Sequence, residues 1–353
     1  MSQKNFKDLF LENILNFLWR QWSALGVLGE ARTKDPWIYD PEPMLIFTVE
    51  MARYEPRLFD EVVDWLIVNG KWVDMQRLRA VLREKNEVNR NVLGAVAAFL
   101  MNQGNERKWR NMSQYCRSHA SDRSNNAEPL FYEKNGKLHP ITKTPDPSFL
   151  AYGFNRPQLR VRRMTREVPI TSHNTLRFLL RALFGLGSRA ECLVYLLTHE
   201  GGHPSEIAKA VGLSLRGTQD ALIELSKSGL ILTRVKGKRK IEYWLSHERW
   251  WEFLSRGSMS EIEKPTWIDW IALYSALSQV WSTLNEINRE GISSYMRSSR
   301  LRDLLEVVGG EFAKSGLDIP PVPVKEVRPE QYEKVFEEFI IKLFGTSYGG
   351  TSK

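Results

Sequence analysis

Apolar side chains recur every three or four positions through the first third of the chain, which is the spacing of a buried helical face. The longest such stripe consists of Phe6, Phe10, Ile14, Phe17, Leu18 and Trp22. Further helices are predicted over residues 41–53, 56–68, 73–83 and 88–101. We therefore expect a helical N-terminal domain over residues 1–117.

The helical spacing stops after this domain. Residues 118–128 are polar and show no period, which is typical of a linker. Residues 129–170 are rich in proline and β-forming residues, with Asn135–Gly136 as an expected hairpin turn. The sequence predicts a linker and an irregular basic segment over residues 118–173.

Helical spacing returns at residue 174 and continues to residue 198 with a break near Gly185. A short helix over residues 205–211 then precedes Gly212-Leu213-Ser214, where glycine can end one helix and serine can cap the next. The next helix, residues 215–228, has a single apolar face, formed by Thr218, Ala221, Leu222 and Leu225.

Two β-forming runs follow Gly229, which ends this helix. They cover residues 230–235 and 240–245, and the turn between them is Lys236-Gly237-Lys238-Arg239. This pattern predicts a hairpin directly after the pair of helices.

Residues 188–246 resemble the winged helix-turn-helix domains of bacterial ArsR- and MarR-type transcriptional regulators. The residues that carry the resemblance are Ile207-Ala208, Val211-Gly212-Leu213-Ser214, Thr218, Leu222, Leu225 and Gly229-Leu230-Ile231. The resemblance implies three helices plus a β-hairpin wing, and a homodimer that reads a palindromic DNA site with the helix 215–228 in the major groove. Winged helices also serve as protein-interaction modules, so a fold of this kind does not by itself fix the function.

The rest of the chain is expected to be helical again. Apolar stripes cover residues 267–284, 301–314 and 331–344, and a polar tail rich in glycine and serine follows. The complete prediction is a mainly α, multi-domain protein with a central winged helix-turn-helix domain over residues 174–247. A helical C-terminal domain would cover residues 248–345, and residues 346–353 would form a disordered tail.

Charge concentrates in the middle of the 353 residues. The net charge of the whole chain is +8, and residues 118–259 carry 22 basic and 13 acidic side chains. Positive charge on the segment that holds the expected helix-turn-helix is the electrostatic footprint of a nucleic-acid binder. The first eight residues contain no apolar signal core, and no run of eighteen apolar residues occurs, so we expect a cytoplasmic protein without a membrane span.

The expected DNA contacts come from the second helix and the hairpin. Arg216 and Gln219 lie on the exposed side of the helix and can read guanine and adenine edges respectively. The cations of the hairpin can reach phosphates or the minor groove. The complete predicted set is Ser214, Leu215, Arg216, Gln219, Arg234, Lys236, Lys238, Arg239 and Lys240. Asp220 opposes phosphate, and Gly217 offers no side chain where related domains often carry serine or threonine.

A second basic cluster lies before the winged helix, with Arg160, Arg162 and Arg163 at its centre. Two interpretations are equally good. The cluster could be an arm along the DNA backbone, or a strap that salt bridges hold to an acidic domain surface.

One motif suggests an enzyme. His199-Glu200-Gly201-Gly202-His203 matches the H-E-x-x-H pattern of zinc hydrolases, which requires both histidines on one face of a continuous helix. Two glycines lie between the histidines, and Pro204 follows, so the required helix is not expected. The segment fits a turn between two helices instead, and we expect no metal site.

No other set of residues predicts catalysis or a cofactor. The two cysteines, Cys116 and Cys192, form no disulfide framework, and Cys192 lies on the apolar face of an expected helix. The stripe of Trp267, Trp270 and Trp281 is either core, a dimer interface or the lining of an effector pocket.

The sequence thus favours a non-enzymatic transcriptional regulator that binds double-stranded DNA as a homodimer, with a small-molecule or protein effector as a further partner. The alternative function is a winged-helix interaction scaffold in a toxin–antitoxin or defence system, with weak or absent DNA binding.

Overall fold

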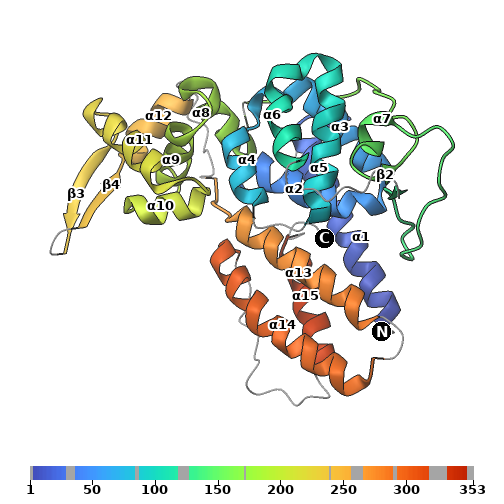
Figure 1. Cartoon of the computed structure of the whole chain (residues 1–353). Coiled ribbons are helices and arrows are strands. Elements are labelled where there is room, and N and C mark those ends of the chain that lie inside the picture. The colour runs from blue at the N-terminus through green and yellow to red at the C-terminus, as the bar shows by residue number, and fades with distance from the viewer. Residues whose placement is uncertain are drawn as a thin grey trace.

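Figure 1 shows a computed structural model that describes residues 3–28, 36–83, 87–117, 127–170, 172–237, 240–255, 265–288, 292–317 and 332–347. The described part of the chain is mainly helical, which confirms the predicted class. Its β-structure is confined to two small two-stranded sheets.

The first five N-terminal helices form where apolar spacing predicted them, and a sixth follows. They are α1 (Gln3–Ala24), α2 (Pro41–Met51), α3 (Pro56–Asn69), α4 (Met75–Leu82), α5 (Glu87–Leu100) and α6 (Glu106–Arg117). Helix α6 was not predicted, because it is polar on most sides. Trp109, Met112 and Cys116 of this helix are fully buried in the core.

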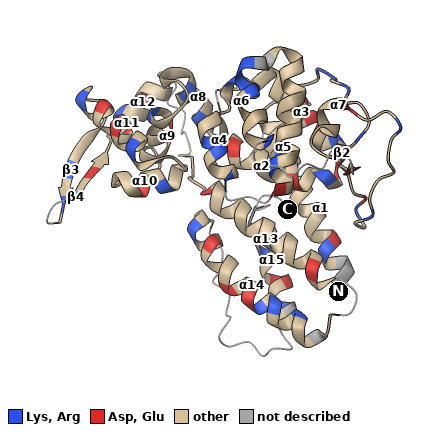
Figure 2. Cartoon of the chain, viewed as in Figure 1, with Lys and Arg blue, Asp and Glu red and all other residues tan. Residues whose placement is uncertain are grey.

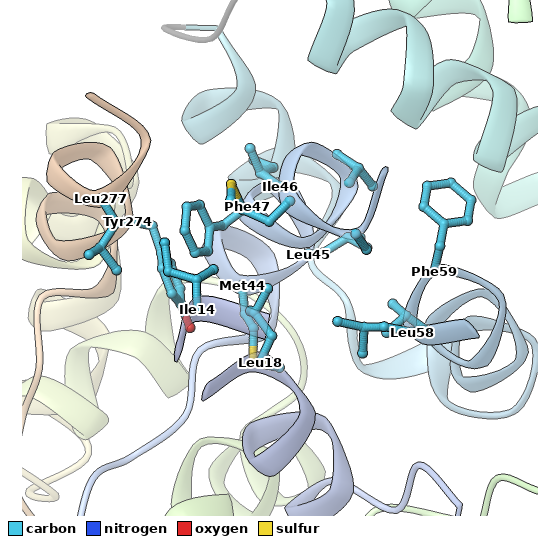
Figure 3. Close-up of a cluster of buried hydrophobic side chains, with 14 of the residues drawn as sticks. Ile14, Leu18, Met44, Leu45, Ile46, Phe47, Leu58, Phe59, Tyr274 and Leu277 are labelled. Atoms are coloured by element: carbon cyan, nitrogen blue, oxygen red, sulfur yellow. The ribbon is translucent and has the colours of Figure 1, made fainter. Parts of the chain in front are cut away.

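The C-terminal helices α13 (Trp270–Ile287), α14 (Ser294–Ser315) and α15 (Tyr332–Ser347) share the hydrophobic core of the N-terminal helices. Figure 3 shows Tyr274 and Leu277 of α13 beside Ile14 of α1 and Phe47 of α2. The rings of Phe47 and Tyr274 are stacked with centroids 4.7 Å apart, and the Tyr274 hydroxyl donates to Gln21 Oε1 over 2.7 Å. Two segments that are far apart in the sequence therefore build one core.

The irregular segment lies over this body. Its regular parts are β1 (Glu128–Pro129), which pairs in parallel with β2 (Phe154–Asn155), and the single turn α7 (Pro147–Leu150). The chain reverses at Asn135–Gly136, where Gly136 takes a φ of 86° and Tyr132 pairs with Leu138.

A second hydrophobic core belongs to the central elements, which lie at one end of the molecule in Figure 1. These elements are α8 (Leu176–Phe184), α9 (Ser188–Leu196), α10 (Pro204–Val211), α11 (Leu215–Lys227), β3 (Leu232–Lys236), β4 (Lys240–Trp244) and α12 (His247–Ser255). We call residues 188–245 the helix–hairpin unit. Strands β3 and β4 pair antiparallel and extend away from the helical body.

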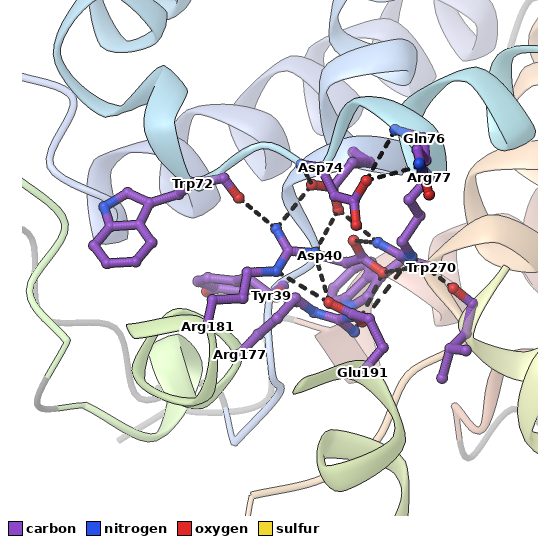
Figure 4. A network of polar contacts seen from close by, with 12 residues as sticks. Tyr39, Asp40, Trp72, Asp74, Gln76, Arg77, Arg177, Arg181, Glu191 and Trp270 are labelled. Atoms are coloured by element: carbon purple, nitrogen blue, oxygen red, sulfur yellow. Dashed lines mark hydrogen bonds and ion pairs between the residues drawn. The ribbon is translucent and has the colours of Figure 1, made fainter. Parts of the chain in front are cut away.

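A buried network of charges joins the two cores (Figure 4). Its acids are Asp40 and Glu42 at the start of α2 and Glu191 of α9, and its bases are Arg77 of α4 and Arg177 and Arg181 of α8. All six side chains are at most 4% exposed.

Every charge in this network has at least two partners. Arg181 lies 2.8 Å from Glu42 and 2.6 Å from Glu191, and Arg77 lies 2.6 Å from Glu42 and also contacts Asp40. Arg177 pairs with Glu191 and, over 3.2 Å, with Asp40. Burial opposes the ionisation of Glu42, but the neighbouring Arg181 and Arg77 outweigh it and hold the pKa of Glu42 below its ordinary value. Three cations and three anions therefore neutralise one another at a site that is buried from solvent.

Removing one member leaves an uncompensated charge, and this gives a stability prediction. The substitution Arg181→Met keeps the aliphatic bulk but removes one partner from each of Glu42 and Glu191 and leaves one net negative charge buried. It should lower the free energy of unfolding by about 3–5 kcal/mol. Chemical denaturation monitored by circular dichroism measures this loss. The matched control is Arg189→Met, because Arg189 pairs with Glu224 over 2.6 Å with both side chains more than half exposed. Its expected cost is about 0–1 kcal/mol, and equal costs for the two variants would contradict the importance of the network.

Candidate nucleic-acid interface

The turn between α10 and α11 forms as its residues predicted. Gly212 ends α10 in the left-handed conformation, with φ 67° and ψ 39°. The Ser214 hydroxyl then caps α11 by accepting the backbone N–H of Gly217 over 3.2 Å. A glycine that stops one helix and a serine that starts the next allow α11 to cross α10 after a short connection.

Helix α11 buries one face and exposes the other. Thr218, Ala221, Leu222 and Leu225 are buried in the second core. The four side chains of α11 and its cap that are predicted to face DNA are exposed: Leu215 is 45% exposed, and Ser214, Arg216 and Gln219 are exposed as well. Within the part of the chain that the structure describes, neither Arg216 nor Gln219 has a side-chain hydrogen bond or ion pair, so both are available to a ligand.

Gly217 has a packing reason in this structure. A Cβ at this position would lie 3.1 Å from Ser214 Oγ and 3.2 Å from Ser188 Oγ. The absence of a side chain at Gly217 therefore lets the start of α11 approach the start of α9.

Backbone hydrogen bonds join the hairpin to the turn between α9 and α10. The sequence did not predict this contact. Gly202 and Tyr243 exchange two backbone hydrogen bonds of 2.9 and 3.0 Å. Gly202 therefore forms an antiparallel bridge with β4. A Cβ on Gly201 would lie 2.9 Å from the Tyr243 carbonyl oxygen, and Gly201 also has a φ of 143°. The glycine pair of the H-E-x-x-H match is thus needed for a close approach of two backbones.

The hairpin cations divide into bound and free groups. Arg234 and Lys236 lie 3.0 and 2.9 Å from Glu242, whose side chain is only 8% exposed. Hydrogen bonding from Lys236, and then from Arg234, lowers the pKa of Glu242. Lys240 is exposed and has no ion pair among the described residues. The predicted contacts Lys238 and Arg239 lie outside the described residues.

The second basic cluster lies along α3 of the helical body. Arg162 is 3.3 Å from Glu61, and the backbone N–H groups of Arg163 and Met164 donate to Asp64 over 3.2 and 3.1 Å. Arg160 is exposed. Of the two interpretations left open by the sequence, these contacts favour the strap on an acidic surface.

The two histidines of the H-E-x-x-H match have separate structural partners. His199 Nδ1 lies 2.9 Å from the carbonyl oxygen of Tyr195, and the two rings stack with centroids 3.9 Å apart. His203 caps α10, where its Nδ1 accepts the backbone N–H of Ser205 over 3.3 Å. Among the described residues, no group of three or more histidine, cysteine or acidic side chains could hold a metal ion.

The remaining candidates from the sequence are mostly core residues. Cys116 and Cys192 are fully buried, and burial raises the pKa of both thiols to about 12. Trp270 and Trp281 are 2% and 4% exposed in the main core. Trp267 differs, because it lines a cavity beside α9.

No family model matches this chain, and no match was found among curated proteins or solved structures. In the described residues, no helix is both long and apolar enough to cross a bilayer.

The partners of His199 and His203 predict the behaviour of a double variant. Replacing both residues with Gln should leave the zinc content of the purified protein unchanged and below one ion per chain, because the two side chains serve a stack and a helix cap. Elemental analysis of wild type and variant checks this. One tightly bound zinc ion in the wild type that the double variant loses would contradict this account.

Proposed function

We propose that this protein binds double-stranded DNA in a sequence-dependent way and acts as a transcriptional regulator through a winged helix-turn-helix. In this proposal, the start of α11 enters the major groove, and the hairpin lies on the flanking backbone. The regulatory role follows from the resemblance to ArsR- and MarR-type regulators.

One observation carries the proposal: the exposed face of α11 presents Arg216 and Gln219 without partners, directly beside a projecting basic hairpin. Figure 2 shows the hairpin and α11 together at the end of the molecule that is remote from the main core. Arginine and glutamine have the donor geometry to read base edges, and a hairpin cation such as Lys240 supplies attraction to phosphate. The element order of three helices and a hairpin agrees with the same proposal.

The hairpin contributes less charge than the sequence suggested. Glu242 holds Arg234 and Lys236, so these two cations would need to exchange an internal partner for phosphate. Lys240 is therefore the described hairpin residue that we assign to backbone contact. Arg162 is already bound to Glu61, and we leave the second basic cluster out of the proposed interface.

The proposed regulator acts as a homodimer on a palindromic site, as the resemblance implies. A two-fold protein places two copies of α11 in successive major grooves on one side of the duplex. The two half-sites of the preferred sequence should therefore be related by two-fold symmetry.

A second candidate function is an interaction scaffold. Val235 and Ile241 form a cross-strand pair on the hairpin and are 73% and 50% exposed. Such a pair suits contact with an apolar protein surface better than contact with phosphate. The two functions differ in salt dependence, because DNA binding releases counterions whereas apolar contact does not.

Salt dependence gives the first test of the interface. The variant Lys240→Ala should reduce the slope of log affinity against log salt by about one unit if one phosphate contact is lost. Fluorescence anisotropy with a labelled duplex, between about 50 and 200 mM salt, measures the slope. The control is Lys334→Ala, since the Lys334 side chain is 81% exposed on α15. Identical slopes for the two variants would exclude a Lys240 contact with DNA.

Base recognition gives the second test. Arg216→Ala should cost about 1–3 kcal/mol at the sequence preferred by the wild type and relax the base choice at one position. Competition binding against single-base variants of that sequence measures both effects. If the same loss occurs on random duplexes, Arg216 contacts phosphate and does not read a base.

A further inference from the structure

A cavity of about 570 Å³ lies where the helix–hairpin unit meets the C-terminal helices. The end of α9 supplies Tyr195 and His199 to its lining. Trp267 and Asp269, just before α13, and Lys314, near the end of α14, also belong to the lining. A cavity of this size suits a small organic molecule.

The α9 side of the cavity is aromatic. The rings of Tyr195 and His199 are stacked within 5° of parallel, and Trp267 meets them edge-on with centroids 5.7 and 5.5 Å away. Aromatic groups arranged in this way offer edges and faces to another ring.

His199 also contributes a hydrogen-bond acceptor. Its Nδ1 lies beside the Tyr195 carbonyl oxygen, which can only accept, so we assign the ring proton to Nδ1. Burial lowers the pKa of His199 and thereby favours the neutral ring. The lone pair of Nε2 is then an acceptor on a ring that lines the cavity.

Two opposite charges line the same cavity without an ion pair between them. Asp269 accepts the backbone N–H of Ala272 over 3.0 Å, and burial raises the pKa of its carboxyl group. Lys314 lies 2.7 Å from Glu311 on the same helix, with its side chain 59% exposed. In the described part of the chain, no salt bridge joins Asp269 to Lys314. Asp269 can therefore receive a cationic ligand group, and the exposed Lys314 can receive an anionic group beside Glu311 or in exchange for it.

We propose that this cavity binds a small zwitterion with an aromatic ring, the chemical class of the aromatic amino acids. The ligand's ammonium group binds Asp269 and His199 Nε2, its carboxylate binds Lys314, and its ring packs against Tyr195 and Trp267. A molecule with only one of the two charges can pair with only one of Asp269 and Lys314.

The site has a physical connection to the buried charge network. The Trp267 ring centroid lies 5.8 Å from the guanidinium carbon of Arg177, and Arg177 binds Glu191 of α9. A ligand held against Trp267 would therefore act on the contacts that position the helix–hairpin unit. This regulatory consequence rests on the proposed function, whereas the binding of the zwitterion does not.

Isothermal titration of the full chain, without DNA, tests the site. The probes are L-phenylalanine, L-tyrosine and L-tryptophan, each compared with its analogue lacking the carboxylate and its analogue lacking the amine. At least one amino acid should bind saturably, and each of its analogues should bind about tenfold or more weakly. Absence of saturable binding by all three amino acids, or equal binding of an analogue, overturns the proposal.

Two variants assign the charges to their residues. Lys314→Gln should weaken binding of the amino acid but not of the analogue that lacks the carboxylate. Asp269→Asn keeps a good helix cap and should weaken binding of the amino acid but not of the analogue that lacks the amine. The controls are Lys334→Gln and Asp146→Asn, because Asp146 caps α7 far from the cavity. Because Lys314 is exposed, Lys314→Gln should fold normally. If this variant binds the amino acid as the wild type does, the proposal is wrong, even if the Asp269 variant fails to fold.

Discussion

Six charged side chains, buried at one junction, join the two hydrophobic cores of this molecule. Asp40, Glu42 and Glu191 are acids that water does not reach, and three arginines replace their hydration. Such a network costs desolvation and repays it only when every partner is in place. Because its members come from α2, α4, α8 and α9, the network forms only when the two hydrophobic cores meet in one arrangement.

This arrangement decides which surfaces stay exposed. Arg77 donates from Nε to the Val211 carbonyl oxygen over 2.6 Å, and a Cβ on Gly212 would lie 2.7 Å from Ile271 of α13. The end of α10 is therefore held against the helical body, while the start of α11 and the hairpin remain exposed. The proposed DNA interface and the proposed ligand cavity lie on two sides of the same docked unit.

Much of the fold could be predicted from sequence, because the information is local. The helical stripe of α1, the glycine and serine that separate α10 from α11, and the β-forming runs of the hairpin each act over a few residues. The pairing of charges is not local. Arg177, Arg181 and Glu191 stand out as charges within apolar helices, but nothing in the sequence shows that the two arginines also pair with Asp40 and Glu42, more than one hundred residues earlier.

The candidate site, like the fold, could be predicted from the sequence only where its features are local. The exposure of Arg216 and Gln219 follows from the period of α11. The capture of Arg234 and Lys236 by Glu242 depends on the register of the two strands, in which Arg234 lies opposite Glu242. The role of Gly201 and Gly202 depends on a contact with β4 some forty residues later, so the sequence could indicate a turn but could not give the reason for it.

The central claim is that the helix–hairpin unit reads DNA sequence. Selection of bound duplexes from a random pool by the full chain, at near-physiological salt, tests it most directly. The account predicts one enriched sequence with two symmetric half-sites about one helical turn apart. A pool whose composition stays random after repeated rounds with folded protein would contradict it.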